Sequence, residues 1–228
     1  GAQGKLQIGR MLSNNGILVG FVVIIVLLSI FAKGFLSLSN LMTIMKQVSP
    51  IGIATLGVGM LIIMNCIDLS IGSMFALCGV VGGLTVSTST AGLGLPPVVG
   101  YLAGISVGLL FGLINGLIVA KGRIPAFIVT MGTQSIARGL ALIIAHGMPV
   151  GGFPPAFNFL GTTSVDKGGL VPWIVIIYVA LVLVMWFFLN KQPTGRHIYA
   201  VGGNEEAAKT AGISVDFVKI KAYLINGA

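Results

Sequence analysis

Acidic side chains are scarce in this sequence, and one of them lies between two apolar stretches. Asp68 is the only acidic residue in the first 165 positions, and Asn65 and Ser70 stand beside it without a surrounding polar loop. Asp68 and Ser70 have side chains that suit a helix N-terminus, so they are predicted to cap the helix that follows. A compatible interpretation is a short break between helices, in which Asn65, Asp68 and Ser70 line a transport path or gate.

One basic residue also falls inside an apolar stretch. Arg138 lies near the middle of the segment 124–145, where a charge needs an acid, backbone carbonyls or a water-filled cavity. Asp68 is a candidate partner for a structural ion pair, and a place in the transport path is the functional alternative. A helix that begins later than Ile124 would instead put Arg138 near a membrane interface.

A polar segment at 190–217 contains a short helix signal. Asn204 is a good N-cap, Glu205 and Glu206 place negative charge in the first turn, and Gly212 can end the helix. A helix of about two turns is marginal alone, so docking on another protein is expected. The residues assigned to this docking element are Asn204, Glu205, Glu206, Ala207, Ala208 and Gly212.

Other patterns carry no chemistry. The stretch 203–210 nearly spells a phosphate-binding loop, but Ala208 replaces the glycine before Lys209 and no strand–loop–helix unit surrounds it. The stretch 104–108 matches a nucleophile elbow but lies inside an apolar helix without acid or base partners. The remaining candidates, which have neither catalytic nor metal-ligand partners at suitable spacing, are Cys66 and Cys78 (expected as buried free thiols) and His146 and His197 (expected in loops). No enzyme activity, cofactor or metal site is predicted.

Five glycines recur at every fourth position of one apolar stretch. A step of four residues advances about 40° beyond a full helical turn, so these glycines form one slowly curling groove into which another helix backbone can pack. A role in sliding during transport is the alternative. The glycines are Gly100, Gly104, Gly108, Gly112 and Gly116.

The elements that position these residues are membrane helices. Only 8% of the residues are charged, 56% are hydrophobic and the mean hydropathy is +1.05, whereas soluble domains carry about 25% charged residues. We predict an all-α transmembrane bundle of about six to seven spans. The spans are expected at 15–35, 48–64 (with Pro50 in its first turn), 71–89, 96–120, 124–145 and 171–189, with a seventh that begins near Val218 and is cut by the end of the chain.

The basic residues predict the orientation. An N-terminus in the cytoplasm puts nine basic residues inside and three outside, which satisfies the positive-inside rule. Residues 1–13 are then expected to form a cytoplasmic segment, 14–228 a single transmembrane domain, and 190–217 a cytoplasmic loop, whereas 146–169 is expected to be external. The net charge of +8 is explained by this distribution and not by nucleic acid. The inside residues are Lys5, Arg10, Lys121, Arg123, Lys191, Arg196, Lys209, Lys219 and Lys221, and the outside residues are Lys33, Lys46 and Lys167.

Several strings resemble a known family. Glu206-Ala207-Ala208 followed by Gly212 resembles the EAA---G pattern of bacterial ABC importer permeases, whose short cytoplasmic helix docks on the ATPase subunit. The chain also resembles the family of ribose, xylose, arabinose and galactose permeases. The resembling strings follow one another in the same order over nearly the whole chain, at 67–73, 115–123, 125–130, 138–139 and 195–204. Asn65 and Cys66 stand where that family usually has Gly or Ser-Gly.

The resemblance implies the membrane subunit of an ATP-driven monosaccharide importer in the bacterial inner membrane. Its partners would be an ABC ATPase at the 190–217 loop, a periplasmic sugar-binding protein outside and a second permease copy. By this resemblance, the sequence is expected to cover the family fold except for roughly its last third. Alternatives are an importer of the same frame for autoinducer-2 or inositol, or an ion-coupled secondary transporter, for which Asp68 and Arg138 are the only charges in place.

Overall fold

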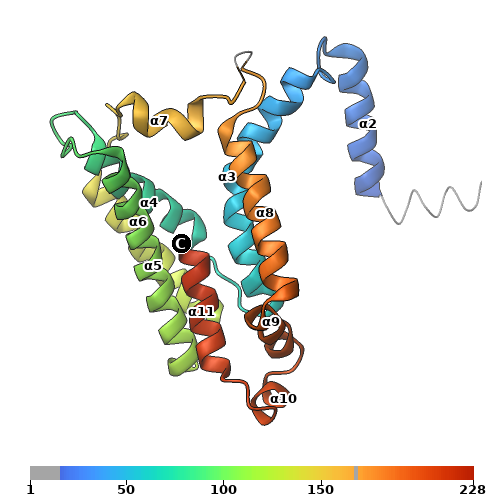
Figure 1. Cartoon of the computed structure of the whole chain (residues 1–228), viewed down its shortest axis with the longest axis vertical. Coiled ribbons are helices and arrows are strands. Elements are labelled where there is room, and N and C mark those ends of the chain that lie inside the picture. Colours follow the sequence, from blue (N-terminus) through green and yellow to red (C-terminus); the bar gives the residue numbers. More distant parts are fainter. Residues whose placement is uncertain (1–15, 167–168) are drawn as a thin grey trace, which may run out of the picture. The chain divides into compact units, whose positions relative to one another are not determined.

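All regular elements among the described residues, 16–166 and 169–228 of this computed structural model, are α-helices, which confirms the all-α prediction (Figure 1). An isolated antiparallel β-bridge joins Ser164 and Pro172. The described residues exclude the predicted cytoplasmic segment 1–13, which contains Lys5 and Arg10. They also exclude Lys167. The helices are α2 (Gly16–Phe31), α3 (Leu38–Ile63), α4 (Ile71–Val86), α5 (Pro97–Gly122), α6 (Ala126–Ile144), α7 (Pro155–Thr162), α8 (Trp173–Lys191), α9 (Pro193–Gly203), α10 (Glu205–Thr210) and α11 (Val215–Gly227).

Four of these helices are long and apolar enough to cross a membrane. They are α3, α5, α6 and α8, and α2 and α4 are shorter apolar helices of 16 residues each. A spanning helix needs about 20 apolar residues. The chain is therefore a multi-pass membrane protein.

The chain divides into two compact units, residues 1–47 and residues 48–228. The first unit holds α2, a turn in which Gly34 has φ of +80°, and the start of α3. The second unit holds every candidate site residue that the structure describes. The single domain over 14–228 stays a prediction.

The second span begins earlier than the sequence indicated. It was predicted over 48–64 with Pro50 in the first turn, but α3 begins at Leu38 and Pro50 lies in its interior. The Ser37 hydroxyl accepts a hydrogen bond from the Asn40 N–H at 3.2 Å and so caps the helix. The first three turns are too polar to register as apolar sequence, and an interior proline is tolerated in membrane helices.

Two helices lie in segments that were expected to be loops. The segment 146–169, which was predicted to be external, contains α7, and the polar segment 190–217 contains α9 before the predicted short helix. Each begins with a proline at its first position, Pro155 and Pro193, where the missing N–H costs nothing. His197 consequently lies in α9 and not in a loop. The neighbouring Gly and Pro residues hid both helices from the sequence pattern.

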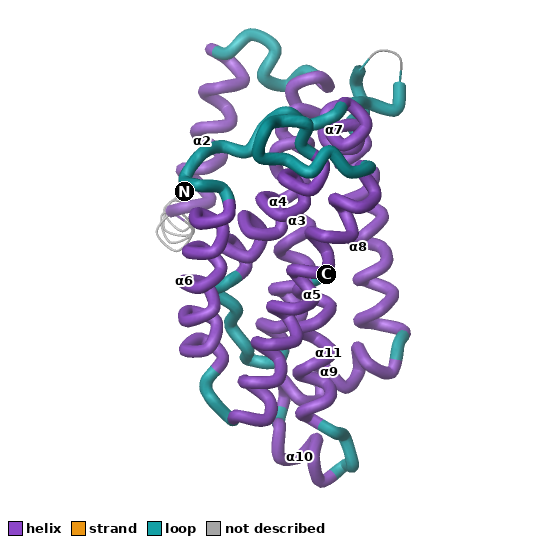
Figure 2. The backbone as a smooth tube through the Cα atoms, turned by 90° about the vertical axis from the view of Figure 1, so that its left-hand side faces the viewer, coloured by secondary structure: helices purple, strands orange, loops and turns teal. Residues whose placement is uncertain are grey.

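Two different helices pack against the row of glycines on α5. Extra Cβ atoms at Gly100 and Gly104 would meet backbone atoms of α4, and those at Gly108, Gly112 and Gly116 would meet the backbone of α11. Helices α5 and α11 run side by side in both ribbon views (Figure 2). Small residues permit this close approach because no side chain separates the backbones.

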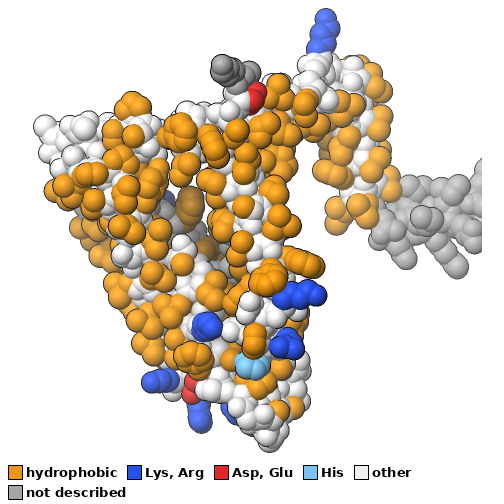
Figure 3. Space-filling model, in the orientation of Figure 1, with side chains coloured by type: hydrophobic (Ala, Val, Ile, Leu, Met, Phe, Trp, Pro, Cys, Tyr) orange, Lys and Arg blue, Asp and Glu red, His pale blue; other side chains and the backbone are white. Residues whose placement is uncertain are grey.

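The outside of the second unit is apolar along most of the helices. Large hydrophobic side chains are exposed on α5 and α8, for example Leu102, Leu110, Leu183 and Val184. Figure 3 shows hydrophobic atoms over the sides of these helices, with Lys and Arg gathered near the end that carries α9 and α10. An apolar surface of this extent suits contact with lipid chains.

Candidate functional site

The segment between α3 and α4 is an irregular break held by neighbouring helices. Asn65 has a left-handed backbone with φ of +56°. The Leu69 N–H donates to the Thr130 hydroxyl of α6 at 3.1 Å, and the same hydroxyl lies 3.3 Å from the Ile67 carbonyl. Thr130 thus accepts from a backbone N–H that the interrupted helix leaves free, as irregular backbone in a membrane requires.

Asp68 is the centre of a buried hydrogen-bond cluster. Its side chain accepts from the Ser70 N–H at 2.8 Å, from the Ser70 hydroxyl at 2.6 Å and from the Asn226 amide of α11 at 2.8 Å. The Ser70 hydroxyl in turn accepts from the Asn115 amide of α5 at 3.1 Å. Asp68 is only 5% exposed. One carboxylate therefore links the break to α5 and α11.

The predicted capping role of Ser70 is wrong in its detail. Ser70 does occupy the N-cap position of α4, but its side chain makes no capping hydrogen bond. The hydroxyl donates to Asp68 and accepts from the Asn115 amide of α5, so it is directed at these side chains and not at an N–H group of α4. Asp68 likewise binds Ser70 and Asn226 rather than the N–H groups of the first turn of α4.

Arg138 does not join the Asp68 cluster. It lies in α6 eight residues beyond Thr130, which is roughly 12 Å along the helix. Its side chain is exposed and borders a separate pocket of about 410 Å³ with Phe153 and Met148. The candidate ion pair between Arg138 and Asp68 is therefore incorrect, because the two residues face different neighbours.

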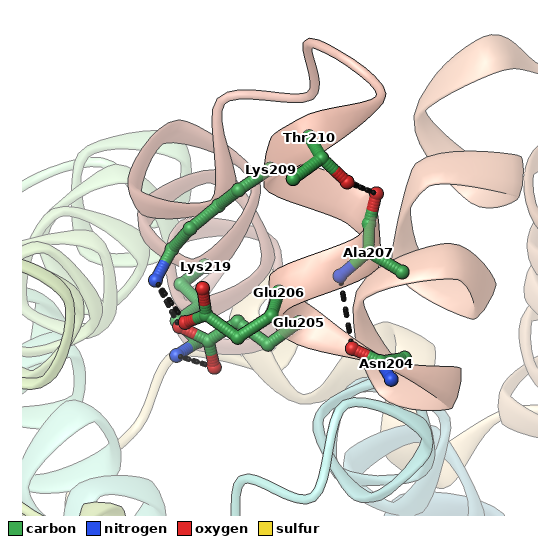
Figure 4. Close-up of polar contacts among 7 residues, drawn as sticks. All are labelled: Asn204, Glu205, Glu206, Ala207, Lys209, Thr210 and Lys219. Carbon is green, nitrogen blue, oxygen red and sulfur yellow. Dashed lines mark hydrogen bonds and ion pairs between the residues drawn. The ribbon is translucent and has the colours of Figure 1, made fainter.

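The short helix α10 forms with the predicted ends. The Asn204 side chain accepts from the Ala207 N–H at 2.9 Å, as an N-cap does (Figure 4). Gly212 has φ of +83°, and the Ile213 N–H donates to the Ala208 carbonyl at 3.0 Å. This is a glycine-terminated helix end, which satisfies carbonyls of the last turn.

The two glutamates of α10 have different surroundings. Glu205 lies 2.7 Å from the Lys219 ammonium of α11, whereas Glu206 pairs with Lys209 of its own helix at 3.0 Å (Figure 4). The Glu205 side chain is 42% exposed and that of Glu206 is 83% exposed. The hydrogen bond from Lys219 holds the pKa of Glu205 below its usual value. Glu205 thus binds α11 of the second unit, and the Glu206 side chain is exposed.

Helices α9 and α10 share a hydrophobic core with the helix break. Ile198 and Val201 of α9 and Ala208 of α10 are buried against Met64 and Cys66 at the end of α3. The Asn65 amide also donates to the Gly202 carbonyl at 3.0 Å.

A polar pocket of about 690 Å³ lies in the same region. Its lining includes Asn65, Glu205, Glu206, Lys209 and Lys219. The structure therefore brings the predicted docking helix and one of the predicted path residues to one place.

Several residues of this site escaped the sequence reasoning. Thr130, Asn115, Lys219 and Asn226 each make a contact that joins two elements. Asn115 and Asn226 are polar residues inside apolar stretches, and that signal could have identified them. Lys219 carries no such signal, since it was one of several basic residues near a membrane end.

The cysteines and metal-ligand types form no site within the part of the chain described. Cys66 is a buried free thiol and Cys78 a partly buried one. The described residues contain no group of three His, Cys, Asp or Glu side chains placed to hold a metal ion.

Comparison with known proteins places this sequence in a family. The family described as the branched-chain amino acid transport system permease component matches residues 40–228. The ribose import permease protein of Haemophilus influenzae is 36% identical over 227 residues, which cover 98% of this chain and 68% of that protein. No solved structure matches the chain.

Two further relatives are named for other solutes. The fructose import permease protein of Rhizobium meliloti is 31% identical over 215 residues, covering 90% of this chain and 59% of that protein. The autoinducer 2 import system permease protein of Yersinia pseudotuberculosis is 30% identical over 210 residues, covering 92% and 58%. The chain thus spans roughly three fifths to two thirds of the length of these relatives. A buried helix break, a capped polar helix beside it and this extent of similarity lead to one conclusion: the chain belongs to the family of membrane permease components that includes the import permeases for ribose, fructose and autoinducer 2.

Proposed function

We propose that this chain is the membrane-spanning subunit of a bacterial ABC importer for a monosaccharide, with ATP hydrolysed by a separate ATPase chain. The carrying observation is the outward-facing Glu206 on a helix that is capped at both ends and anchored to the permease core. A partner bound to α10 would therefore act on the whole second unit and not on a loose loop. Similarity to the ribose and fructose permeases supports a sugar as the solute.

The partners follow from the same proposal. An ATPase subunit docks on α10 from the cytoplasm, a periplasmic binding protein delivers the sugar on the other side, and a second permease copy completes the pathway. The N-terminus lies in the cytoplasm of a bacterial inner membrane, because the basic residues gather on the side of α9 and α10. The permease itself moves solute without covalent chemistry or a cofactor.

Charge reversal at the exposed glutamate tests the proposal. In the assembled importer, Glu206→Lys should abolish ATP hydrolysis stimulated by the sugar-loaded binding protein, while the permease still inserts into the membrane. Asp216→Lys is the matched control, since Asp216 is an exposed acid at the start of α11 and outside α10. Normal sugar uptake by the Glu206→Lys importer would contradict the proposal.

A second candidate solute is autoinducer 2. The observation that favours it is the similarity to an autoinducer 2 permease over most of this chain. Uptake of labelled ribose, fructose and autoinducer 2 by cells that carry the complete importer separates these candidates. Loss of uptake on ATP depletion, with persistence under proton and sodium uncouplers, excludes the ion-coupled alternative.

A further inference from the structure

Helix α11 is fixed at two points to two different parts of the candidate site. Lys219 donates to Glu205 of α10 at 2.7 Å, and Asn226 donates to Asp68 of the helix break at 2.8 Å. Lys219 and Asn226 are seven residues apart, which is two helical turns or roughly 10 Å along the axis. Positions separated by seven lie on the same face of a helix, so one face of α11 spans the distance from α10 to the break.

The body of α11 packs with its backbone directly against α5. The backbone of Tyr223 lies where a side chain on Gly112 would be, and Ile220 lies beside Gly116 in the same way. Tyr223 is fully buried. With no side chains between the backbones, α11 and α5 form one stiff pair, and Asn115 of α5 also reaches the Asp68 cluster through Ser70.

The cluster at the break has hydrogen-bonding capacity that these contacts do not use. The Asn115 and Asn226 carbonyl oxygens are buried, and neither has a hydrogen-bond partner among the described residues. Buried polar atoms without partners are unfavourable, so arrangements that satisfy them compete with the observed one. A small shift of α11 relative to Asp68 is therefore a change that the break can accommodate.

We propose that α11 transmits displacement of α10 to the helix break, with Lys219 and Asn226 as the positioning residues at its two ends. Lys219 holds α11 to Glu205, so movement imposed on α10 by a docked partner reaches α11. Asn226 then transmits the movement of α11 to Asp68 through their hydrogen bond. This inference rests on the proposed function, since it is the ATPase that moves α10.

The native thiol two residues before Asp68 supplies a readout. Cys66 is buried in the break, and a Cys78→Ala background leaves it as the only thiol in the sequence. In the assembled importer in lipid, the rate of Cys66 labelling by a membrane-permeant maleimide is measured with and without a non-hydrolysable ATP analogue. We expect the nucleotide to change this rate by about threefold or more, and Lys219→Met and Asn226→Leu to remove most of the change although the ATPase still co-purifies.

Two controls separate transmission from stability. Lys209→Met also removes an ion pair to Glu205, but one within α10, so it should keep the nucleotide response. Glu205→Lys combined with Lys219→Glu restores an opposite-charge pair and should recover a response that each single change loses. This rescue keeps the test informative where a single variant folds poorly.

The outcomes distinguish this inference from the proposed function. A response in Lys219→Met equal to that in Lys209→Met would overturn transmission through α11, and so would a rate in the unaltered permease that ignores nucleotide. Both results leave ATP hydrolysis stimulated by the binding protein intact. Loss of the proposed function itself would instead appear as Glu206→Lys having no effect on that hydrolysis.

Discussion

Neighbouring residues of the same type have different tasks in this permease because of where the helix turns them. Glu205 and Glu206 adjoin in the sequence, yet one pairs with α11 and the other is exposed. On an α-helix, consecutive side chains point about 100° apart. Asn204 fixes that orientation by defining where α10 begins.

Removal of this N-cap should weaken α10. We expect Asn204→Ala to destabilise the helix by about 1 kcal/mol, because the Ala207 N–H loses its acceptor. The ATPase should then co-purify with the permease in smaller amounts, measured as the ratio of the two subunits after mild washing. Asn204→Asp keeps an acceptor and should retain the unaltered ratio. Equal losses in both variants would argue against a capping effect.

The lowered pKa of Glu205 predicts how acid affects the permease. A carboxyl whose pKa is lower in the folded state stabilises that state above its ordinary pKa, and this stabilisation disappears as the pH falls through the lowered value. From about pH 5 to about pH 3 the unaltered permease should lose more thermal stability in detergent than Lys219→Met does. Lys221→Met is the control, since Lys221 binds Thr194 and not Glu205. Parallel stability curves for the unaltered protein and Lys219→Met would refute this assignment.

At the scale of elements, one regular row of glycines serves two partners. The first part of the row lies against α4 and the later part against α11, so α5 joins the break region to the C-terminal helix. Membrane helices gain little from the hydrophobic effect when they associate, so close backbone packing carries much of the stability. A methyl group in the row should therefore be costly.

The matched pair Gly112→Ala and Gly132→Ala tests this packing. A Cβ at Gly112 would meet the Tyr223 carbonyl, whereas nothing lies within 4 Å of a Cβ at Gly132. Forcing α11 away should cost about 1–3 kcal/mol, and Gly132→Ala should be neutral or gain a few tenths from helix propensity. Thermal unfolding of the two purified variants provides the comparison. If Gly112→Ala is as stable as Gly132→Ala, the two backbones do not pack as described.

At the scale of the whole molecule, charge distribution is what relates the helices to the membrane. An apolar exterior requires lipid around the helices, and the basic residues near α9 and α10 favour the cytoplasmic side. This orientation puts α10 within reach of an ATPase.

Single cysteines test the orientation in intact cells. With Cys66 and Cys78 replaced by Ala, Thr210→Cys at the end of α10 should resist a membrane-impermeant maleimide, whereas Gly161→Cys in α7 should be labelled. Both positions are exposed, so burial does not explain a difference. Permeabilised cells should label both. Labelling of Thr210→Cys alone in intact cells would reverse the proposed topology.

The sequence by itself determined the membrane character, the order of the apolar helices and the ends of α10. Composition decides whether a chain needs lipid, and the cap and terminating glycine of α10 act within a few residues of one another. Local signals of this kind can be read without a partner. The same locality explains the misplaced start of α3, where polar residues weakened the apolar signal in its first turns.

Only the tertiary structure decided which distant residues meet. Asp68 and Asn226 are 158 positions apart, and Glu205 and Lys219 come from different helices. A charge in an apolar stretch announces that it needs a partner, but several candidates satisfy that need equally well in sequence, as the mistaken pairing of Asp68 with Arg138 shows. Helix packing selects among them, because the glycine row brings α11 against α5 and thereby places Asn226, and not Arg138, beside the carboxylate.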